Sequence, residues 1–416
     1  MTAALFATLL TFAAPPRLAT LGLSLAALIP LAWSLWLALL SACSGALPRL
    51  PAARRLWRFD VVVPAHDEEG GIARTVRSLR AVDYPAEAFR VLVVADNCSD
   101  RTAEVAREAS AIVIERHDLA LRGKGYALEH AFAESRCEGR ADAVVVVDAD
   151  TVVSHNLLTE FAAHLEAGAS AVQADYAVSN PEASWRTRLL RIALAMFHVL
   201  RSRGRERLRL SCGLRGNGMC LTHALLTRVP WTAFSRVEDV EYGLRLGEAR
   251  VRVAYAGWAQ VFGEMVSGGR AAKSQRNRWE GGRAALARSR ALPLLRSALS
   301  RRDVVLLDLA LDLLVPPLST AAAISAVGCA LALLLFARGG SAVPLSLWSS
   351  AAVCLCVYVV RGWAISGTGL RGVRDLLAAP AYLGWKLMLA LRPAVGTEWV
   401  RTARETPDGP PGQGAA

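Results

Sequence analysis

Carboxylates follow three short apolar runs at the point where each run ends. They are Asp67 and Glu68 after the first run, Asp96 after the second, and Asp148 and Asp150 after the third. Carboxylates in a tight turn can accept hydrogen bonds from the ring N–H of a nucleobase. Mg²⁺ and Mn²⁺ prefer sites in which a few protein carboxylates join the phosphates of a substrate. The residue types therefore indicate a bound nucleoside diphosphate and a divalent cation.

Helix capping is the alternative explanation for these acidic turns. The turn after the first run could simply cap the next helix, and Asp100 is well placed to cap the helix after the second run. Capping does not explain Asp96, which stands earlier in its turn. It does not explain Asp148 and Asp150 either, because like charges so close together need a cation or hydrogen bonds. On an extended chain these two would point to opposite sides, one toward a ribose and one toward the cation.

Two further segments carry groups suited to catalysis. Residues 237–241 (Val-Glu-Asp-Val-Glu) offer an acid pair, for which a solvated turn at a helix start is the plain alternative. Gln275, Arg278 and Trp279 fall on one face of a helix. They would present an amide, a guanidinium that binds phosphate in a bidentate manner, and an aromatic platform. The alternative there is a basic helix on a membrane surface.

Alternating strands and helices must position these groups. The expected strands are 61–63, 91–94 and 144–147, and the expected helices are 71–80, 100–109 and 156–167. Apolar strands buried on both faces and separated by helices are typical of an α/β fold with a mostly parallel sheet. Such folds carry their chemistry in loops at the carboxyl ends of the strands, where the acidic motifs fall.

The composition indicates that part of the chain lies in a membrane. Of the 416 residues, 53% are hydrophobic and 20% are charged, which excludes a disordered, collagen-like or small disulfide-stapled protein. Residues 18–43 are uncharged and long enough to cross about 30 Å of hydrocarbon as a helix. Arg54, Arg55 and Arg58 follow, which places the downstream side in the cytoplasm. A retained anchor is favoured over a cleaved signal peptide, because a charged segment before the apolar one is missing.

Two more apolar stretches, 304–337 and 343–360, follow the α/β region. Asp308 and Asp312 lie in the first part of the first stretch, so we expect that part to be interfacial and the crossing helix to come after it. The second stretch would cross back, and 376–391 would lie in the interface. The sequence thus predicts three membrane crossings.

Four parts result from this division. They are a membrane anchor over 1–50, an α/β domain over 51–300, transmembrane and interfacial helices over 301–395, and a partly disordered cytoplasmic tail over 396–416. The formal charge of +12 would suit a nucleic-acid partner. However, only three of the 48 basic residues are lysines, and several arginines flank apolar segments, where anionic lipids explain them. We expect contacts with membrane lipids and no nucleic-acid partner.

Taken together, the motifs resemble the membrane-integrated family 2 glycosyltransferases that include bacterial cellulose, hyaluronan, chitin-oligomer and poly-N-acetylglucosamine synthases. The resemblance runs from about Asp60 to Arg290 and rests on PAHDEE, DNCSD, DAD, VED and a complete QxxRW. The segments 122–128 (RGKGYAL) and 214–219 (LRGNGM) resemble the family as well. The resemblance implies a GT-A fold, a nucleotide-sugar donor that is UDP-linked, metal dependence on Mg²⁺ or Mn²⁺, and inverting transfer of a hexose.

The same resemblance implies roles for residues of this chain. Those expected to bind substrate are Asp67, Glu68 and Asp96 at the uridine, Asp148 at the ribose and diphosphate, and Lys124, Glu238, Gln275, Arg278 and Trp279. Asp150 would hold the metal, and Asp239 would be the general base. A sugar hydroxyl is a poor nucleophile, and an aligned carboxylate base raises its rate by roughly 10²–10⁴. Asp67 departs from the family pattern, which often has asparagine at that position.

Three functions are compatible with these expectations. The first is a synthase of the cell membrane, with a cytoplasmic catalytic domain, that extends a cell-surface or extracellular poly- or oligosaccharide. The alternative is a glycosyltransferase that makes a single addition to a lipid or lipid-linked acceptor. A membrane scaffold or transport protein without catalysis gives no reason for Asp150, Asp239 and Arg278 to occur together. Three crossings are few for a polysaccharide channel, so export would need a partner or a second copy.

Overall fold

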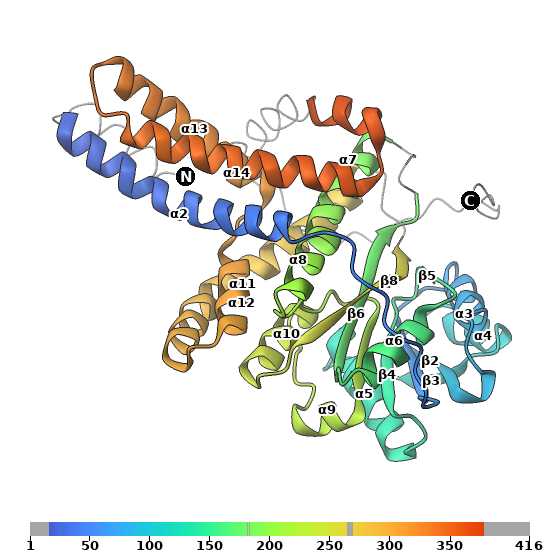
Figure 1. Ribbon diagram of the computed structural model, residues 1–416. Coiled ribbons are helices and arrows are strands. Elements are labelled where there is room, and N and C mark those ends of the chain that lie inside the picture. The colour runs from blue at the N-terminus through green and yellow to red at the C-terminus, as the bar shows by residue number, and fades with distance from the viewer. Residues whose placement is uncertain (1–15, 181, 183, 264–268, 378–416) are drawn as a thin grey trace.

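An eight-stranded mixed sheet forms the centre of the α/β domain (Figure 1). The computed structural model describes residues 16–180, 182, 184–263 and 269–377, with the side chains of 269–279 outside the description. The strand order is β3-β2-β1-β4-β7-β6-β8-β5. Four of the seven pairings among the described strands are parallel, β1 with β2 and β4, β2 with β3, and β6 with β8. This mixed sheet with more parallel than antiparallel pairings agrees with the mostly parallel α/β fold that the sequence predicts.

All three predicted strands and all three predicted helices of this domain are confirmed. They are β1 (Phe59–Ala65), α3 (Ile72–Arg80), β2 (Phe89–Asp96), α4 (Thr102–Glu108), β4 (Ala143–Val146) and α6 (Leu157–Glu166). The other strands are β3 (Ile112–Arg116), β5 (Thr151–Val153), β6 (Ala171–Val178), β7 (Met219–Thr222) and β8 (Val253–Gly263). The other helices of the domain are η1 (Ala86–Ala88), α5 (Lys124–Glu138), α7 (Trp185–Leu194), the π-helical η2 (Ala195–Leu200), α8 (Arg201–Arg207), α9 (His223–Arg228), α10 (Glu238–Glu248) and α11 (Gly269–Arg301).

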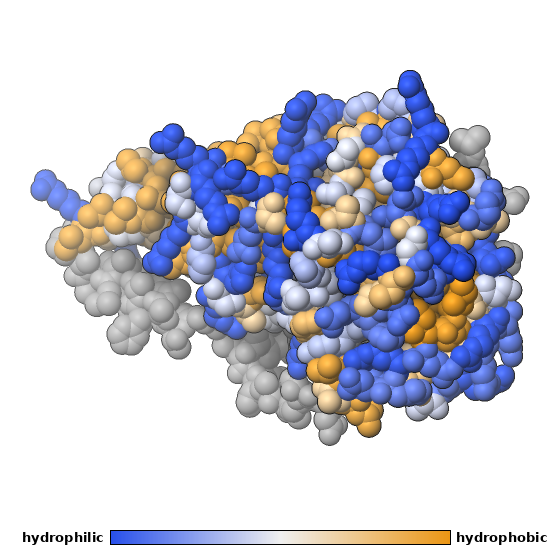
Figure 2. All heavy atoms as spheres, turned by 90° about the horizontal axis from the view of Figure 1, so that it is seen from below, coloured by the Kyte–Doolittle hydropathy of each residue, from blue (hydrophilic) through white to orange (hydrophobic). Residues whose placement is uncertain are grey.

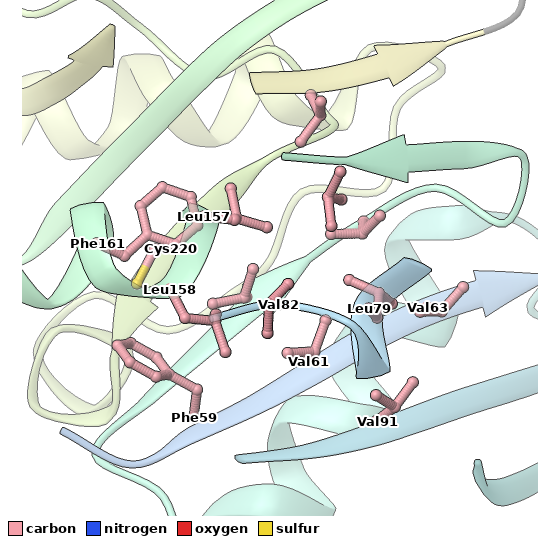
Figure 3. Packing of buried hydrophobic residues seen from close by; sticks show 14 of the residues in the cluster. Phe59, Val61, Val63, Leu79, Val82, Val91, Leu157, Leu158, Phe161 and Cys220 are labelled. Atoms are coloured by element: carbon pink, nitrogen blue, oxygen red, sulfur yellow. The ribbon is translucent and has the colours of Figure 1, made fainter. Parts of the chain in front are cut away.

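Alternate residues of β1 point into two hydrophobic cores, one on each face of the sheet. Val61 and Val63 face the side covered by α3 and α6, where they belong to one cluster with Phe161 (Figure 3). Val62 faces the opposite side, where it belongs to a second cluster with Leu128 of α5. Because each fully buried Val or Leu side chain contributes about 1.5–3 kcal/mol, the central strands are held rigidly. The loops at their carboxyl ends therefore start from fixed positions.

Three helices among the described residues are long and apolar enough to cross a membrane, which agrees with the predicted number of crossings. They are α2 (Pro16–Ala42), α13 (Leu318–Ala337) and α14 (Val343–Ser366). They extend together from one side of the α/β domain (Figure 1), and hydrophobic side chains gather over that end of the molecule (Figure 2). Each helix exposes large apolar side chains, such as Ile29, Val327 and Val353. The predicted interfacial segment 376–391 falls almost entirely outside the described residues, and the tail falls wholly outside them.

Helix α12 (Val304–Leu314) precedes the crossing helix α13, and its two aspartates face inward rather than toward a surface. Arg205 of α8 donates from Nε to Asp308 Oδ2 at 2.8 Å and from Nη2 to Asp312 Oδ1 at 2.7 Å. Arg201 and Arg283 also pair with Asp312. This ion-pair network ties the α/β domain to the helices at the membrane end. Buried charges of this kind require such partners.

Candidate active site

Lys124 joins three segments that are distant in the sequence. It is the first residue of α5, and its Nζ donates to Asp148 Oδ1 at 2.5 Å and to the Gly216 carbonyl at 2.6 Å. The carboxylate of Glu238 lies 3.7 Å away. Burial alone would lower the pKa of Lys124, but Asp148 and Glu238 outweigh it and raise the pKa above its usual range. The ammonium is therefore charged, which its predicted role at the substrate requires.

The acidic residues Asp148 and Asp150 lie in a turn between β4 and β5. The expectation that they alternate along an extended chain is wrong, because the chain turns here to leave the middle of the sheet for its far edge. The Asp148 side chain remains 31% exposed beside Lys124. Two partly exposed carboxylates at one turn fit Mg²⁺ or Mn²⁺, which take few protein oxygens and complete their shell with phosphate and water.

Asp239 and Glu238 form the first turn of α10. These residues begin a helix, as the alternative explanation held, but Glu238 is only 8% exposed and so is not solvated. Burial, together with repulsion from Glu238, raises the pKa of Asp239 to about 6, while the charge of Lys124 acts in the opposite direction. A carboxylate with this pKa is ionised at neutral pH and can still accept a proton, which suits a general base.

The loop before β7 brings Asp239 and Lys124 to the same point. Its Gly216 has φ +78°, and a Cβ on it would lie 3.3 Å from Asp239 Oδ2 and 3.5 Å from Lys124 Nζ. The next residue, Asn217, is fully buried and accepts from the Asp148 N–H at 3.2 Å through Oδ1. The structure thus brings together four predicted site residues, Lys124, Asp148, Glu238 and Asp239.

Asp96 lies at the end of β2, away from the turns that cap helices. Arg116, the last residue of β3, donates from Nη1 to Asp96 Oδ1 at 2.6 Å, and both side chains are nearly buried. His66 Nδ1 lies 2.7 Å from the Asp96 carbonyl, so the turns after β1 and β2 are tied together. Arg116 therefore fixes the Asp96 carboxylate at the strand ends where a base is expected.

Asp67 also links these two turns. It adopts φ +54°, and its Oδ1 accepts from the Ser99 N–H at 2.6 Å, which lowers the pKa of Asp67. Asp100 accepts from the Thr102 N–H at 2.9 Å, so it bonds to the first residue of α4, although the N-cap position itself is Arg101. Oxygen and sulfur atoms of Asp67, Cys98 and Asp100 lie within 4.8 Å of one another. Hydrogen bonds within the turns account for this clustering.

The remaining predicted residues, Glu68, Gln275, Arg278 and Trp279, lie outside the group around Lys124 or have side chains that are not described. Glu68 donates its backbone N–H to Thr102 Oγ1 at 2.7 Å, at the turn where a uridine contact is predicted. Gln275, Arg278 and Trp279 lie on α11, as the helical spacing predicts. Their side chains are outside the described residues, so their roles remain predictions.

Two residues that support the site were not predicted from the sequence. Arg116 ends a short strand that hydrophobic periodicity did not reveal. Gln173 lies within β6, is 1% exposed, and bonds to the loop that carries Gly216. A lone amide inside an apolar stretch could have signalled it, because a buried amide needs hydrogen-bond partners.

Comparison with known proteins adds relatives and a fold match. The chain is 27% identical over 202 residues to "Probable glycosyltransferase YdaM" of Bacillus subtilis, covering 46% of this chain and 47% of that protein. It is 29% identical over 234 residues to "Beta-monoglucosyldiacylglycerol synthase" of Synechocystis sp., covering 53% of this chain and 47% of that protein. The chain thus spans about half the length of these curated relatives.

A solved structure supports the fold. It is the mannosyltransferase PcManGT from Pyrobaculum calidifontis in complex with GDP-Man and Mn²⁺, with a TM-score of 0.53 at 17% identity. The match covers 82% of this chain and 98% of that one. At the level of sequence, the family model "Glycosyltransferase like family 2" matches residues 57–282, which is more than half of the chain. The chain belongs to glycosyltransferase family 2.

Proposed function

We propose that this protein transfers a hexose from a UDP-linked donor to an acceptor held at the membrane, with inversion at the anomeric carbon. The observation that carries the proposal is the meeting of Lys124, Asp148 and the Gly216 carbonyl beside Asp239. A charged ammonium, an acidic turn suited to a cation and a carboxylate with a raised pKa are the groups this reaction needs.

The proposed step is a single displacement. The acceptor oxygen forms a bond to the anomeric carbon while the bond from that carbon to the diphosphate oxygen breaks. Asp239 takes the proton of the acceptor hydroxyl, and the nucleoside diphosphate leaves with the electron pair. Lys124 offsets the negative charge that develops on the leaving group. A divalent cation held by Asp150 and Asp148 would supply further charge stabilisation there.

The donor's base would lie at the turns after β1 and β2, and its ribose beside Asp148. Asp96, fixed by Arg116, is available as an acceptor for the ring N–H of uracil. Asp67 and Glu68 border the same place. Gln275, Arg278 and Trp279 would complete the acceptor and diphosphate site from α11.

For the acceptor, we propose a lipid or lipid-linked alcohol. The likeness to the Synechocystis synthase, whose name specifies a diacylglycerol glycolipid, supports this class. The three described helices that are apolar enough to cross a membrane support it too, because they would hold the catalytic domain at the surface where such acceptors lie. A growing saccharide is the second candidate, and the complete QxxRW motif favours it.

The catalytic domain would lie on the cytoplasmic side of the cell membrane. Arg54, Arg55 and Arg58 follow the end of α2 at Ala42 by 12 to 16 residues, and short basic segments of this kind remain in the cytoplasm. Nucleotide sugars are supplied on that side, so the site and its donor would share a compartment.

The test is a product analysis with purified full-length protein in lipid nanodiscs. Radiolabelled UDP-glucose, UDP-galactose and UDP-N-acetylglucosamine are each offered with diacylglycerol, with lipid extract and with short saccharides, in the presence of Mn²⁺. One discrete labelled lipid is the expected product. A ladder of lengths would instead establish saccharide elongation. No transfer or hydrolysis of any nucleotide sugar would contradict the proposed function.

A further inference from the structure

The peptide groups of the loop 213–218 need hydrogen-bond partners from other parts of the chain. Three of its residues, Gly213, Gly216 and Gly218, have φ values of +75°, +78° and +69°. Left-handed residues interrupt regular hydrogen bonding, and buried peptide groups must still find partners. This loop also carries the carbonyl that binds Lys124, so its exact course matters to the site.

A buried side chain supplies several of these partners. Gln173 of β6 donates from Nε2 to the Asn217 carbonyl at 2.7 Å, and the same nitrogen lies 3.2 Å from the Gly218 carbonyl, which also accepts from the Ala174 N–H at 2.8 Å. Its Oε1 accepts from the Arg215 N–H at 2.8 Å. β6 pairs with β7 on one side and with β8 on the other, so this amide is anchored on a rigid element.

The same loop touches the acidic turn after β4. The Asn217 side chain accepts from the Asp148 N–H at 3.2 Å and donates to Thr151 Oγ1 at 2.8 Å. Gly216, one residue earlier, accepts from Lys124 and lies against Asp239. Gln173 is therefore hydrogen-bonded to the segment that contacts Lys124, Asp148 and Asp239.

We propose that Gln173 is a positioning residue for the transfer reaction. It holds residues 215–218 of the loop 213–218 in place, so that Lys124, Asp148 and Asp239 meet the donor together. This inference rests on the proposed function. Gln173 touches none of the three itself and acts through the loop.

The chemistry of the site requires an amide at this position. The loop presents two carbonyls and one N–H to the same side chain, so the side chain must donate and accept at once. Glutamate would set an acceptor against two carbonyls, and leucine would leave the N–H and the carbonyls without this partner. Glutamine supplies both functions on an uncharged group that can be buried.

The test compares Gln173→Leu and Gln173→Glu with a matched control, Gln260→Leu. Gln260 lies on the neighbouring strand β8 and donates to Asp175 at 3.1 Å, outside the loop. In nanodiscs, both Gln173 variants are expected to lose roughly 10²-fold in kcat with a smaller change in KM for the donor, as misplacement of catalytic groups does. The control is expected to keep wild-type kcat, and thermal unfolding shows whether each variant is folded.

The pH profile separates positioning from general damage. If loop 215–218 shifts, Lys124 moves relative to Asp239, and the acid limb of kcat/KM moves with it in the Gln173 variants but not in the control. Should Gln173→Leu fail to fold, Gln173→Met keeps the unbranched shape of the side chain and serves instead. Gln173 variants with the kcat and acid limb of Gln260→Leu would overturn the inference and leave the proposed function intact.

A binding measurement makes the two failures distinguishable. Calorimetry with UDP and Mn²⁺ is run on the wild type and on each variant. A wild type that binds UDP but transfers no sugar overturns the proposed function, and the positioning role falls with it. A wild type that transfers sugar while the Gln173 variants match the control overturns the positioning role alone.

Discussion

Gly216 faces the carboxylate of Asp239 so closely that even a Cβ would press against it. A Cβ on Gly216 would lie 3.3 Å from Asp239 Oδ2, and the residue holds φ +78°. We predict that Gly216→Ala lowers kcat by at least an order of magnitude, because backbone strain of roughly 1–2 kcal/mol and the new contact both displace the loop from Lys124. Steady-state kinetics of the purified variant measures the loss.

The control for this prediction is Gly139→Ala. Gly139 has φ +62°, but nothing lies within 4 Å of a Cβ built there. It ends α5 far from the acidic turns, so the substitution adds similar strain without a contact in the site. Equal losses of activity in the two variants, matched by equal losses of thermal stability, would contradict the specific role of Gly216.

The raised pKa of Asp239 predicts an acid limb in the rate. A general base works when it is deprotonated, so activity should be full above a pKa of about 6 and fall tenfold per pH unit below it. The measurement is kcat/KM for the donor between pH 4.5 and 8.5. Asp239→Asn should lose roughly 10²–10⁴ in kcat at every pH while still binding UDP with Mn²⁺. An unchanged rate in that variant would refute the assignment.

The charge of Lys124 should be visible in the same profile. Lys124 lowers the pKa of Asp239, and Glu238 raises it. In Lys124→Met the lowering contribution is lost, so the acid limb should move to higher pH and kcat should fall at neutral pH. Lys124→Arg keeps the charge and should keep the limb near its original position. A limb that stays in place in Lys124→Met would show that the two groups do not interact.

Asp150 is predicted to hold the divalent cation. Asp150→Asn removes one charge from the acidic turn, so the Mn²⁺ concentration needed for half-maximal activity should rise by an order of magnitude or more. Glu166→Gln, a change of the same kind on α6, is the control and should leave that concentration unchanged. Full wild-type activity in the presence of excess EDTA would contradict a metal-dependent reaction.

Hydrophobic periodicity revealed the elements that are buried on both faces. β1, β2 and β4 are short runs of Val and Ala between amphipathic helices, and such runs have few other interpretations. Strands β5 to β8 lie in the half of the sheet with antiparallel pairings, and their mixed composition gives no clear period. Their pairing depends on contacts between distant residues, which no local pattern reports.

The candidate site divides in a similar way. Residue type and spacing pointed to Asp148, because paired carboxylates at a strand end have few structural uses. Lys124 and Asp239 were predicted only through the family resemblance. The arrangement could not be predicted, since Lys124 reaches Asp148 and Gly216 across 24 and 92 residues. Gln173 escaped notice because its function depends on a loop whose course only the fold determines.

The ion-pair network at the membrane end is the least predictable feature of the fold. Arg205 and Asp308 are each 2% exposed or less as side chains, and they come from helices about 100 residues apart. Asp312 has two further arginine partners, Arg201 and Arg283, whereas the described partner of Asp308 is Arg205 alone. The Arg205 guanidinium should therefore be the main group that compensates the buried charge of Asp308.

We predict that Arg205→Leu destabilises the protein by roughly 3–5 kcal/mol, because it leaves the Asp308 carboxylate buried without its partner. The double variant Arg205→Leu/Asp308→Leu should recover much of that loss. It leaves no unpaired carboxylate at position 308, and the two leucines can pack against the leucines of α12. Thermal unfolding in detergent of the wild type, the single variant and the double variant measures both effects. Arg207→Leu, two residues further along α8, is the surface control, and it should leave the Asp308 ion pair and the loss attributed to it unaffected. A double variant no more stable than Arg205→Leu would show that packing of the guanidinium, rather than its charge, holds α8 against α12.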